Sequence, residues 1–291
     1  MQLALFGTGV LGSAIAERLH RTGHLVTVYN RTIEKALPLR NRGLRVVSRS
    51  ADAMGSAEAV LLLLADETAI RSVLLQGETA QRLAGRTIIQ MGTIGPDQSL
   101  ELAFEIQRLG GAYMEAPVLG SVTEAAQGTL LVMVGSTPEQ FTQWSPMLQA
   151  LGQEVQRIGP VGSAAVIKLA LNQLIAAETA AFGLSLGLVR RNGLSTDTFM
   201  ALLRKSALFA PTFDKKLPRL TTREYQRPNF STRHLLKDVD LMLETSQRAG
   251  LSTLGLQGVR SLLERALEMG FSDGDYSALY EAIDGAGNGR A

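Results

Sequence analysis

The first half of the chain alternates short apolar runs with longer amphipathic segments, and this alternation constrains the fold more than any other feature. Continuous apolar strands between helical patterns are typical of a parallel sheet that helices cover on both faces. Helical patterns lie, for example, over residues 10–21 and 96–109. We expect buried strands at residues 2–6, 25–29, 60–64, 87–91, 113–116 and 130–134. The pattern predicts an α/β domain with a doubly wound, mainly parallel sheet.

The pattern changes at the turn Gly159-Pro160-Val161-Gly162, after which only helical patterns follow, over residues 164–188, 195–206, 231–249 and 254–269. The segment 164–188 is apolar nearly all round, which predicts a buried helix. We therefore expect an α/β domain over residues 1–161 and an all-α domain over residues 162–291, linked by this long helix. The tail 284–291 has no core-forming residues, and we expect it to be disordered.

Charge and cysteine content exclude several functions. The chain has 29 Lys and Arg against 27 Asp and Glu, a net charge of +2, so no basic face for nucleic acid is expected. It has no cysteine, which excludes disulfides, thiolate zinc sites and a cysteine nucleophile, and we expect no metal. The longest uninterrupted apolar run, residues 59–65, is shorter than the roughly 20 residues of a membrane span. The N-terminus has no basic region of a secretory signal. We expect a cytoplasmic protein that binds neither membrane nor nucleic acid.

A glycine-rich loop between the first predicted strand and the first predicted helix points to a dinucleotide. The first glycine of such a G-x-G-x-x-G loop permits a tight turn, and the second lets the backbone approach a pyrophosphate. The third lets the helix pack closely on the strand, and the helix N-terminus offers N–H groups to the phosphates. This predicts a Rossmann domain whose cofactor contacts are Gly7, Thr8, Gly9, Val10, Leu11 and Gly12.

The end of the second predicted strand indicates which dinucleotide binds. NAD enzymes usually place an acid there for the ribose hydroxyls, whereas this chain has Asn30-Arg31-Thr32 and no acid before Glu34. Arg31 can pair with a 2′-phosphate, Asn30 and Thr32 can donate hydrogen bonds to it, and Lys35 adds charge. We therefore expect NADP(H) rather than NAD(H); the alternative is that Arg31 is a solvated loop residue. Further cofactor contacts are expected at the end of the third predicted strand, from Leu64, Ala65 and Asp66.

A lysine inside the long apolar helix is the candidate catalytic residue. Lys168 and Asn172 are four residues apart, so both side chains lie on one face of the helix. A lysine among apolar neighbours is costly unless it has partners or a chemical role. The alternative is a lysine whose ammonium group reaches the surface along its aliphatic stem.

Four further segments carry a resemblance, and they occur in the family's order: Met91-Gly92-Thr93-Ile94-Gly95-Pro96; Glu115-Ala116-Pro117-Val118-Leu119-Gly120-Ser121 with Gly128-Thr129-Leu130; residues 162–172 with Gly162, Lys168 and Asn172; and Phe230 with Lys237-Asp238-Val239. With the glycine loop, they make the chain resemble the β-hydroxyacid dehydrogenase family, of the 6-phosphogluconate dehydrogenase-like superfamily. That family includes 3-hydroxyisobutyrate dehydrogenases and glyoxylate/succinic semialdehyde reductases. The resemblance implies a Rossmann domain, a long helix and an all-α domain, with dimers or tetramers as the assembly.

The resemblance also implies roles for individual residues. Lys168 would be the general acid that protonates the substrate oxygen as hydride leaves the nicotinamide, and the base in the reverse direction, with a pKa that desolvation can lower. Asn172 would hold Lys168 or a substrate oxygen. Thr93 would contact both nicotinamide and substrate, Gly120 and Ser121 would form an anion cradle, and Phe230, Lys237 and Asp238 would close over the cofactor and substrate. The implied reaction is NADPH-dependent reduction of a small aldehyde acid.

Two departures from the family pattern affect the substrate more than the reaction. Gly92 and Leu119 stand where the family usually has serines that contact a substrate carboxylate, so the pocket has fewer donors and is more apolar. Leu171 and Ala164 replace an asparagine and a glycine that many members have. An imine or a bulkier ketone is therefore an alternative substrate, although imine reductases generally lack the lysine. A non-catalytic NADP sensor is a second alternative.

Overall fold

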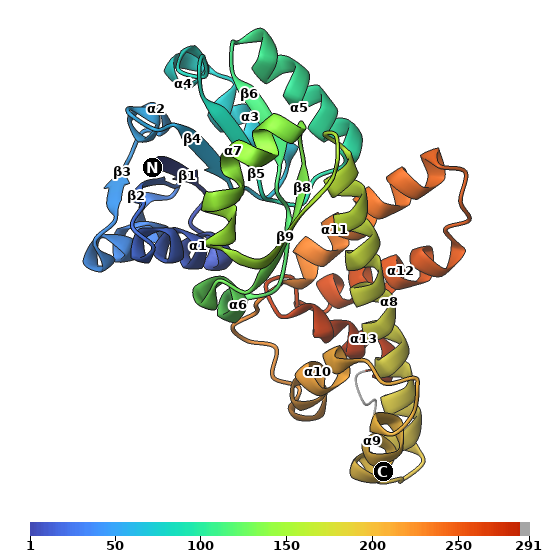
Figure 1. The fold of residues 1–291 in the computed structure, drawn as a ribbon. Helices are drawn as coiled ribbons and strands as arrows, with labels where there is room; N and C mark the ends of the chain where they lie inside the picture. The colour runs from blue at the N-terminus through green and yellow to red at the C-terminus, as the bar shows by residue number, and fades with distance from the viewer. Residues whose placement is uncertain (286–291) are drawn as a thin grey trace. The chain divides into compact units, whose positions relative to one another are not determined.

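The computed structural model describes residues 1–285, which form two compact units, residues 1–169 and 170–285. The first unit is built on a nine-stranded sheet with the order β3-β2-β1-β4-β5-β6-β8-β7, and β9 pairs with β8 (Figure 1). Its strands are β1 (Gln2–Phe6), β2 (Leu25–Tyr29), β3 (Arg45–Val47), β4 (Ala59–Leu62), β5 (Thr87–Gln90), β6 (Ala112–Glu115), β7 (Val118–Leu119), β8 (Leu130–Gly135) and β9 (Gly152–Gly159). The order 3-2-1-4-5-6 is that of a Rossmann domain.

Strand pairing is parallel from β3 through β6, antiparallel between β8 and each of β6 and β7, and parallel between β8 and β9. Helices cover both faces: α1 (Val10–Arg21), α2 (Ser50–Met54), α3 (Glu67–Leu74), α4 (Gly77–Gln81), α5 (Pro96–Arg108), α6 (Val122–Gln127) and α7 (Pro138–Gln149). Two 3-10 helices, η1 (Ile33–Lys35) and η2 (Leu37–Arg42), lead from β2 to β3. The predicted doubly wound, mainly parallel sheet is confirmed.

The two faces of the sheet have separate hydrophobic cores, because successive side chains of a strand point to opposite faces. Leu5 of β1 packs with Ile15 of α1 and Trp144 of α7 on one face. Phe6 of β1 packs on the other face with Ile70 of α3 and Leu102 of α5. Strands that are buried on both faces need apolar residues at every position, which is why the strand pattern of the sequence was continuous.

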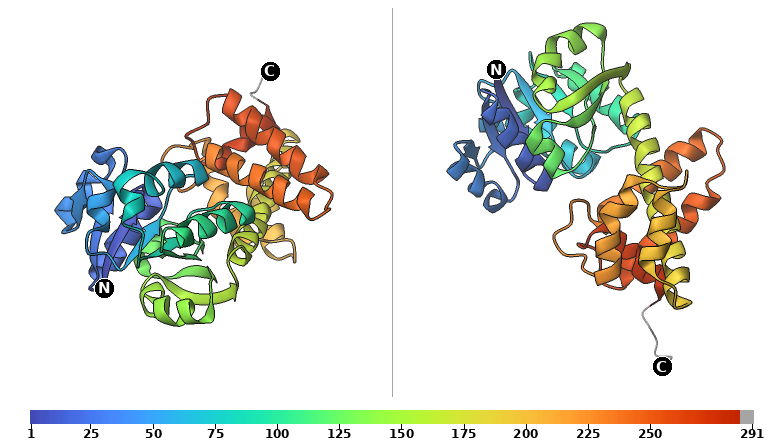
Figure 2. Two further views of the ribbon diagram at one scale, coloured as in Figure 1. Left: turned by 90° about the horizontal axis from the view of Figure 1, so that it is seen from above. Right: turned by 60° about the horizontal axis from the view of Figure 1, so that its bottom comes forward.

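The second unit is all-helical, as predicted. Its helices gather around the C-terminal part of α8 (Ser163–Arg191), which begins in the first unit (Figure 2). Its core packs α8, α9, α10 and α13 together through Phe182, Leu186, Met200, Phe213, Leu220 and Tyr280. The other helices are α9 (Thr196–Arg204), α10 (Pro211–Thr222), α11 (Thr232–Arg248), α12 (Leu254–Glu268), η3 (Tyr276–Ala278) and α13 (Leu279–Asp284).

Two expectations need correction. Strands β3, β7 and β9 were not predicted, because the first two are very short and β9 is a mostly polar strand whose residues after Gly152 are exposed or half-buried. The predicted tail 284–291 begins too early: Asp284 ends α13 and pairs with Arg191 at 2.8 Å, and residues 286–291 lie outside the described part of the chain. The compact units meet after Leu169, inside α8, and the predicted boundary after residue 161 lies just before that helix begins at Ser163.

Helix α8 was expected to be buried and is only partly so. Several of its large apolar side chains are exposed, among them Leu174, Leu184 and Leu188 at 52%, 64% and 66%. In residues 1–285 it is the one helix with the length and hydropathy of a membrane span, a mean hydropathy of 1.3 over 18 residues. The core helix of a water-soluble protein can meet the same criteria, so length and composition alone assign no membrane to α8.

Candidate active site

The glycine loop joins β1 to α1 with the geometry that a dinucleotide requires. Gly7 has a φ of +100°, and a Cβ there would lie 2.3 Å from the Leu63 carbonyl oxygen. A Cβ on Gly12 would lie 2.0 Å from the Gly7 carbonyl oxygen, so the helix packs against the loop only without a side chain there. At Gly9, the residue before α1, a Cβ would meet nothing within 4 Å. No side chain caps the N-terminus of α1, so its N–H groups remain available for phosphate.

The polar residues after β2 divide into two groups. Asn30 Oδ1 accepts from the Thr8 N–H at 3.1 Å, and Asn30 Nδ2 donates to the Thr32 carbonyl oxygen at 2.8 Å. Asn30 therefore ties the strand end to the glycine loop, and one of the two amide hydrogens with which it was expected to bind a 2′-phosphate is donated to backbone. Arg31 and Lys35 are exposed, and among the described residues neither forms an ion pair.

Beyond β4, the predicted cofactor contacts form a loop that leads into α3. Leu64 is half-buried, whereas Ala65 and Asp66 are exposed. Asp66 is the N-cap of α3, and its carboxylate accepts from the Ala69 N–H at 2.8 Å. A cap of this kind holds the loop in place and leaves its residues at the carboxyl end of β4, the edge of the sheet at which dinucleotides bind.

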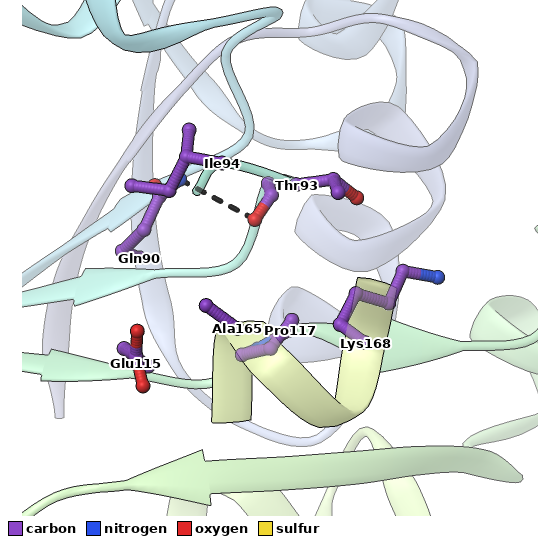
Figure 3. A pocket seen from close by; sticks show the side chains of 8 residues that line it. Gln90, Thr93, Ile94, Glu115, Pro117, Ala165 and Lys168 are labelled. Carbon is purple, nitrogen blue, oxygen red and sulfur yellow. Dashed lines mark hydrogen bonds between the residues drawn. The ribbon is translucent and has the colours of Figure 1, made fainter. Parts of the chain in front are cut away.

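The candidate catalytic lysine lines a small hollow of about 10 Å³ in the first unit (Figure 3). Thr93 and Gly92 contribute to it from the segment after β5, and Pro117 from the segment after β6. The full lining is Gln90, Gly92, Thr93, Ile94, Glu115, Pro117, Ala165 and Lys168. The structure thus brings together three of the predicted site residues, Gly92, Thr93 and Lys168, beside the carboxyl ends of β5 and β6.

Two buried polar side chains form the floor of this hollow. Gln90 and Glu115 are each 1% exposed and end the neighbouring strands β5 and β6. Glu115 Oε2 accepts from the backbone N–H groups of Gly162 and Ala164, at 2.9 and 3.2 Å. Burial raises the pKa of the Glu115 carboxyl, since desolvation disfavours its charged form. Glu115 therefore holds the first turn of α8, the helix that carries Lys168.

The family pattern usually has a serine in place of Gly92, but a serine here would require neighbouring backbone to shift. A Cβ at Gly92 would lie 2.8 Å from the Leu64 carbonyl oxygen and 3.3 Å from Gln90 Nε2. The Gln90 amide donates to the Gly92 carbonyl oxygen at 3.3 Å, which fixes the same segment from the other side. The departure at Gly92 thus follows from close approach of the loop after β4 to the segment after β5.

In the predicted anion cradle at Gly120 and Ser121, the donors of Ser121 bind a carboxylate of the chain itself. Both its N–H, at 2.8 Å, and its hydroxyl donate to the Glu124 carboxylate, in the capping box of α6. These donors are therefore already engaged by a negative charge. Gly120 keeps a φ of +137°, and a Cβ there would lie 2.6 Å from a Leu130 methyl carbon, so only glycine fits. Leu119 is half-buried and pairs with Leu131 across β7 and β8.

In the helical unit, the other predicted residues form a buried polar network. Asn172 Nδ2 donates to Asp238 Oδ2 at 2.7 Å, and Lys237 Nζ lies 2.8 Å from Asp238 Oδ1. Asn172 and Asp238 are each 2% exposed. Phe230 lies outside this network and packs edge-on against Tyr276, with ring centroids 5.8 Å apart. Asn172 was expected to bind Lys168 or substrate, and one hydrogen of its amide group is donated to Asp238.

Comparison with known proteins decides the family. A family model described as the NAD binding domain of 6-phosphogluconate dehydrogenase matches residues 2–159. A second, described as NAD-binding of NADP-dependent 3-hydroxyisobutyrate dehydrogenase, matches residues 162–283. Glyoxylate/succinic semialdehyde reductase 1 of Arabidopsis thaliana is 30% identical over 285 residues, which are 97% of this chain and 98% of the reductase. The chain belongs to the β-hydroxyacid dehydrogenase family.

Solved structures agree on the fold of this β-hydroxyacid dehydrogenase. The 3-hydroxyisobutyrate dehydrogenase from Salmonella typhimurium has a TM-score of 0.88 at 22% identity, covering 97% of this chain and 99% of that one. A reductive aminase from Aspergillus terreus, solved with NADPH and ethyl levulinate, has a TM-score of 0.67 at 26% identity and covers 96% and 98%. The chain is therefore an NAD(P)-dependent oxidoreductase of the β-hydroxyacid dehydrogenase and semialdehyde reductase type.

Two residues that line the hollow, Gln90 and Glu115, were not singled out as candidate site residues in the sequence. Gln90 was counted only as part of a strand, and Glu115 only as part of a motif. A polar residue that ends a fully apolar strand is the signal that could have found both, because strand ends at this edge of a parallel sheet face the ligand. Within residues 1–285, no group of three or more His, Asp or Glu side chains is arranged to hold a metal ion.

Proposed function

We propose that this enzyme reduces a small aldehyde acid, such as glyoxylate or a semialdehyde, with NADPH, and that Lys168 transfers the proton. The observation that carries the proposal is the position of Lys168 beside Thr93 at the carboxyl ends of β5 and β6. A bound nicotinamide supplies the hydride and accepts it in the reverse reaction. The substrate class is that named in the Arabidopsis thaliana relative, glyoxylate and succinic semialdehyde.

Lys168 suits a proton transfer because an ammonium group can donate while negative charge develops on the substrate oxygen. In the reductive direction, hydride adds to the carbonyl carbon, the C=O π electrons move to oxygen, and Lys168 Nζ gives that oxygen a proton. In the oxidative direction, the neutral amine takes the hydroxyl proton. Thr93 Oγ1 would orient the same oxygen or the carboxamide of the nicotinamide, a role supported by the hollow that Thr93 and Lys168 both line.

The preference for NADPH rests on Arg31 and Lys35. Both are exposed beside the end of β2, where the ribose of a dinucleotide lies in Rossmann domains. An arginine binds a phosphate with two parallel hydrogen bonds, whereas it gives no comparable contact to a ribose hydroxyl. No acidic residue stands at 30–33 to favour NADH.

A reductase for an imine or a bulkier ketone is the second candidate. It is favoured because the site offers few hydrogen-bond donors to a substrate carboxylate. Gly92 and Leu119 have no hydroxyl, and both donors of Ser121 bind Glu124. A substrate carboxylate would have to compete with the Glu124 carboxylate there. The likeness to the reductive aminase adds to this candidate, and Lys168 favours the first one.

We also propose that the protein is a homo-oligomer, formed through α8. Six small or leucine residues lie on one side of this helix at alternating spacings of four and three: Ala170, Leu174, Ala177, Ala181, Leu184 and Leu188. That spacing is the heptad pattern by which two helices pack side by side. The three leucines are each more than half exposed, and a partner chain would bury them.

Steady-state assays with NADPH and a panel of glyoxylate, semialdehydes, neutral ketones and cyclic imines test the enzymatic function. We expect turnover of aldehyde acids and a fall in kcat of at least about 100-fold in Lys168→Ala, the range of a lost general acid. Lys205→Ala, an exposed lysine of the helical unit, is the control. Turnover that persists in Lys168→Ala would remove the proton-transfer role. NADPH binding without turnover of any compound would favour the sensor.

A further inference from the structure

The end of β6 places one side chain between two strands and a helix. Glu115 is the register partner of Gln90 on β5 and of Gly135 on β8. Paired residues of neighbouring strands point to the same face of a sheet, so the Gln90 and Glu115 side chains lie together on the face that also holds α5. Figure 3 shows Ala165 of α8 between Glu115 and Lys168, and all three residues line the hollow with Gln90.

Each of these two side chains has one satisfied and one unsatisfied polar atom. Gln90 Nε2 donates to Gly92, and Glu115 Oε2 accepts from Gly162 and Ala164. Among the described residues, Gln90 Oε1 and Glu115 Oε1 have no hydrogen-bond partner, although both are fully buried. The nearby Ser99 hydroxyl bonds to Tyr113 Oη at 2.8 Å and acts to lower the pKa of the Glu115 carboxyl, but it forms no hydrogen bond with Oε1. Buried acceptors without a donor are costly, so a donor is needed at this place.

The hollow beside the two oxygens has the size of one water molecule. Its volume of about 10 Å³ is at the lower limit of what a single buried water requires. A water has two hydrogens, and one can be donated to each of the two orphan oxygens. An apolar group beside these oxygens would leave both acceptors unsatisfied.

We propose that Gln90 and Glu115 are positioning residues for Lys168: they hold one buried water between them, and the Glu115 carboxylate fixes the first turn of α8. Lys168 lies five residues after Ser163, where α8 begins, so a shift of that turn moves the lysine with it. The contact also suits the helix, because N–H groups of a first turn have no partner within the helix and attract negative charge. This inference rests on the proton-transfer role proposed for Lys168.

The test compares Glu115→Leu with Glu115→Gln. Leucine removes both acceptors, and we expect kcat to fall by about tenfold or more, as small displacements of a catalytic group do, while the KM for NADPH changes less than about twofold. Glutamine keeps an acceptor for Gly162 and Ala164 and brings an N–H₂ donor toward Gln90 Oε1, so it should recover most of the lost kcat. A folded Glu115→Leu enzyme with wild-type kcat would overturn the proposal.

Two measurements do not depend on turnover. Hydrogen exchange of the backbone amides at residues 162–166 should be faster in Glu115→Leu than in the wild type, and unchanged exchange would contradict the contact with α8. A high-resolution crystal structure should hold a water within hydrogen-bond distance of both Oε1 atoms, and direct contact of the two side chains would remove the water. If Lys168→Ala keeps its activity, the proposed function fails and these two measurements still decide the contact.

Gln90→Leu keeps the contact between Glu115 and α8 and removes only one partner of the water. It replaces Glu115→Leu if that variant does not fold. We expect a decrease in kcat of about threefold to tenfold, with the KM for NADPH again unchanged, because the carboxylate loses part of its support. A wild-type kcat in Gln90→Leu would show that the water has no part in positioning Lys168.

Discussion

The Glu115 carboxylate occupies the space that a side chain at Gly135 would need. A Cβ at Gly135 would lie 2.1 Å from Glu115 Oε2, and the two residues are paired across β6 and β8. The Glu115 side chain therefore depends on a glycine at the facing position of the next strand.

This dependence predicts a compensating pair. Gly135→Ala alone should lower the free energy of unfolding by about 1–3 kcal/mol, the usual cost of overpacking, and should lower kcat. Glu115→Asp withdraws the carboxylate by one methylene, so the double variant should recover most of the stability and activity that Gly135→Ala loses. Urea unfolding and steady-state kinetics on all four proteins measure this. Additive losses in the double variant would show that Gly135 and Glu115 do not share this space.

The raised pKa of Glu115 predicts a pH-dependent stability difference. A group whose pKa is raised by folding stabilises the protein below its unfolded pKa, about 4.3 for glutamate, and loses this contribution as pH rises through the folded pKa. Glu115→Gln cannot ionise and should escape this loss. The urea midpoint of Glu115→Gln relative to the wild type should therefore be higher at about pH 8 than at about pH 5. If the urea midpoint of Glu115→Gln relative to the wild type decreased from about pH 5 to about pH 8, folding would not raise the pKa of Glu115.

The sheet could be predicted from the sequence where a strand is almost entirely apolar. β1 and β2 were found at their observed bounds, because each has a single polar residue, Gln2 and Thr27. β9 escaped, because it lies at the edge of the sheet and its sequence Gly-Gln-Glu-Val-Gln-Arg-Ile-Gly is mostly polar. Helix α8 was found but its burial was overestimated, since an apolar sequence does not reveal whether a chain covers its own helix.

Candidate site residues were harder to interpret from the sequence where a polar side chain can also form a hydrogen bond with residues near it in the chain. Ser121 looked like an anion ligand, yet Ser-x-x-Glu is also a capping box, and here Glu124 takes its donors. Asn30 likewise bonds the backbone of the glycine loop. The Gln90–Glu115 pair depends on the register of two strands that are 25 residues apart in sequence, and no local pattern specifies that register.

Arg31→Ala should reduce the preference for NADPH. If Arg31 pairs with the 2′-phosphate, its removal should raise the KM for NADPH about tenfold to 100-fold, the equivalent of one charge-assisted contact. The KM for NADH should change little, because NADH lacks that phosphate. Arg45→Ala, another arginine of the same unit, serves as the control. Equal changes for the two cofactors would show that Arg31 acts on something other than the phosphate.

Asn172→Asp should destabilise the helical unit at neutral pH. The new carboxylate would face the Asp238 carboxylate, because the Asn172 Nδ2 atom that it replaces lies 2.7 Å from Asp238 Oδ2. Asn172 and Asp238 are each 2% exposed. Two buried carboxylates cannot both ionise without a large cost, so we expect a loss of about 2–4 kcal/mol that shrinks as the pH is lowered. Gln173→Glu, the neighbouring amide-to-acid change, controls for net charge. Urea midpoints at neutral and acidic pH measure the effect, and a pH-independent loss would contradict it.

Leu184→Glu should separate the proposed homo-oligomer. Leu184 lies within the apolar stripe of α8 and is 64% exposed in the single chain, so a charge there would be buried against a partner. We expect light scattering coupled to size exclusion to give an oligomer for the wild type and a monomer for the variant. Leu254→Glu, on an exposed leucine of α12 at 76%, should leave the oligomer intact. A monomeric wild-type protein would contradict the proposed oligomer. If that monomer sedimented with lipid vesicles and Leu184→Glu did not, a membrane would be the partner of the exposed face of α8.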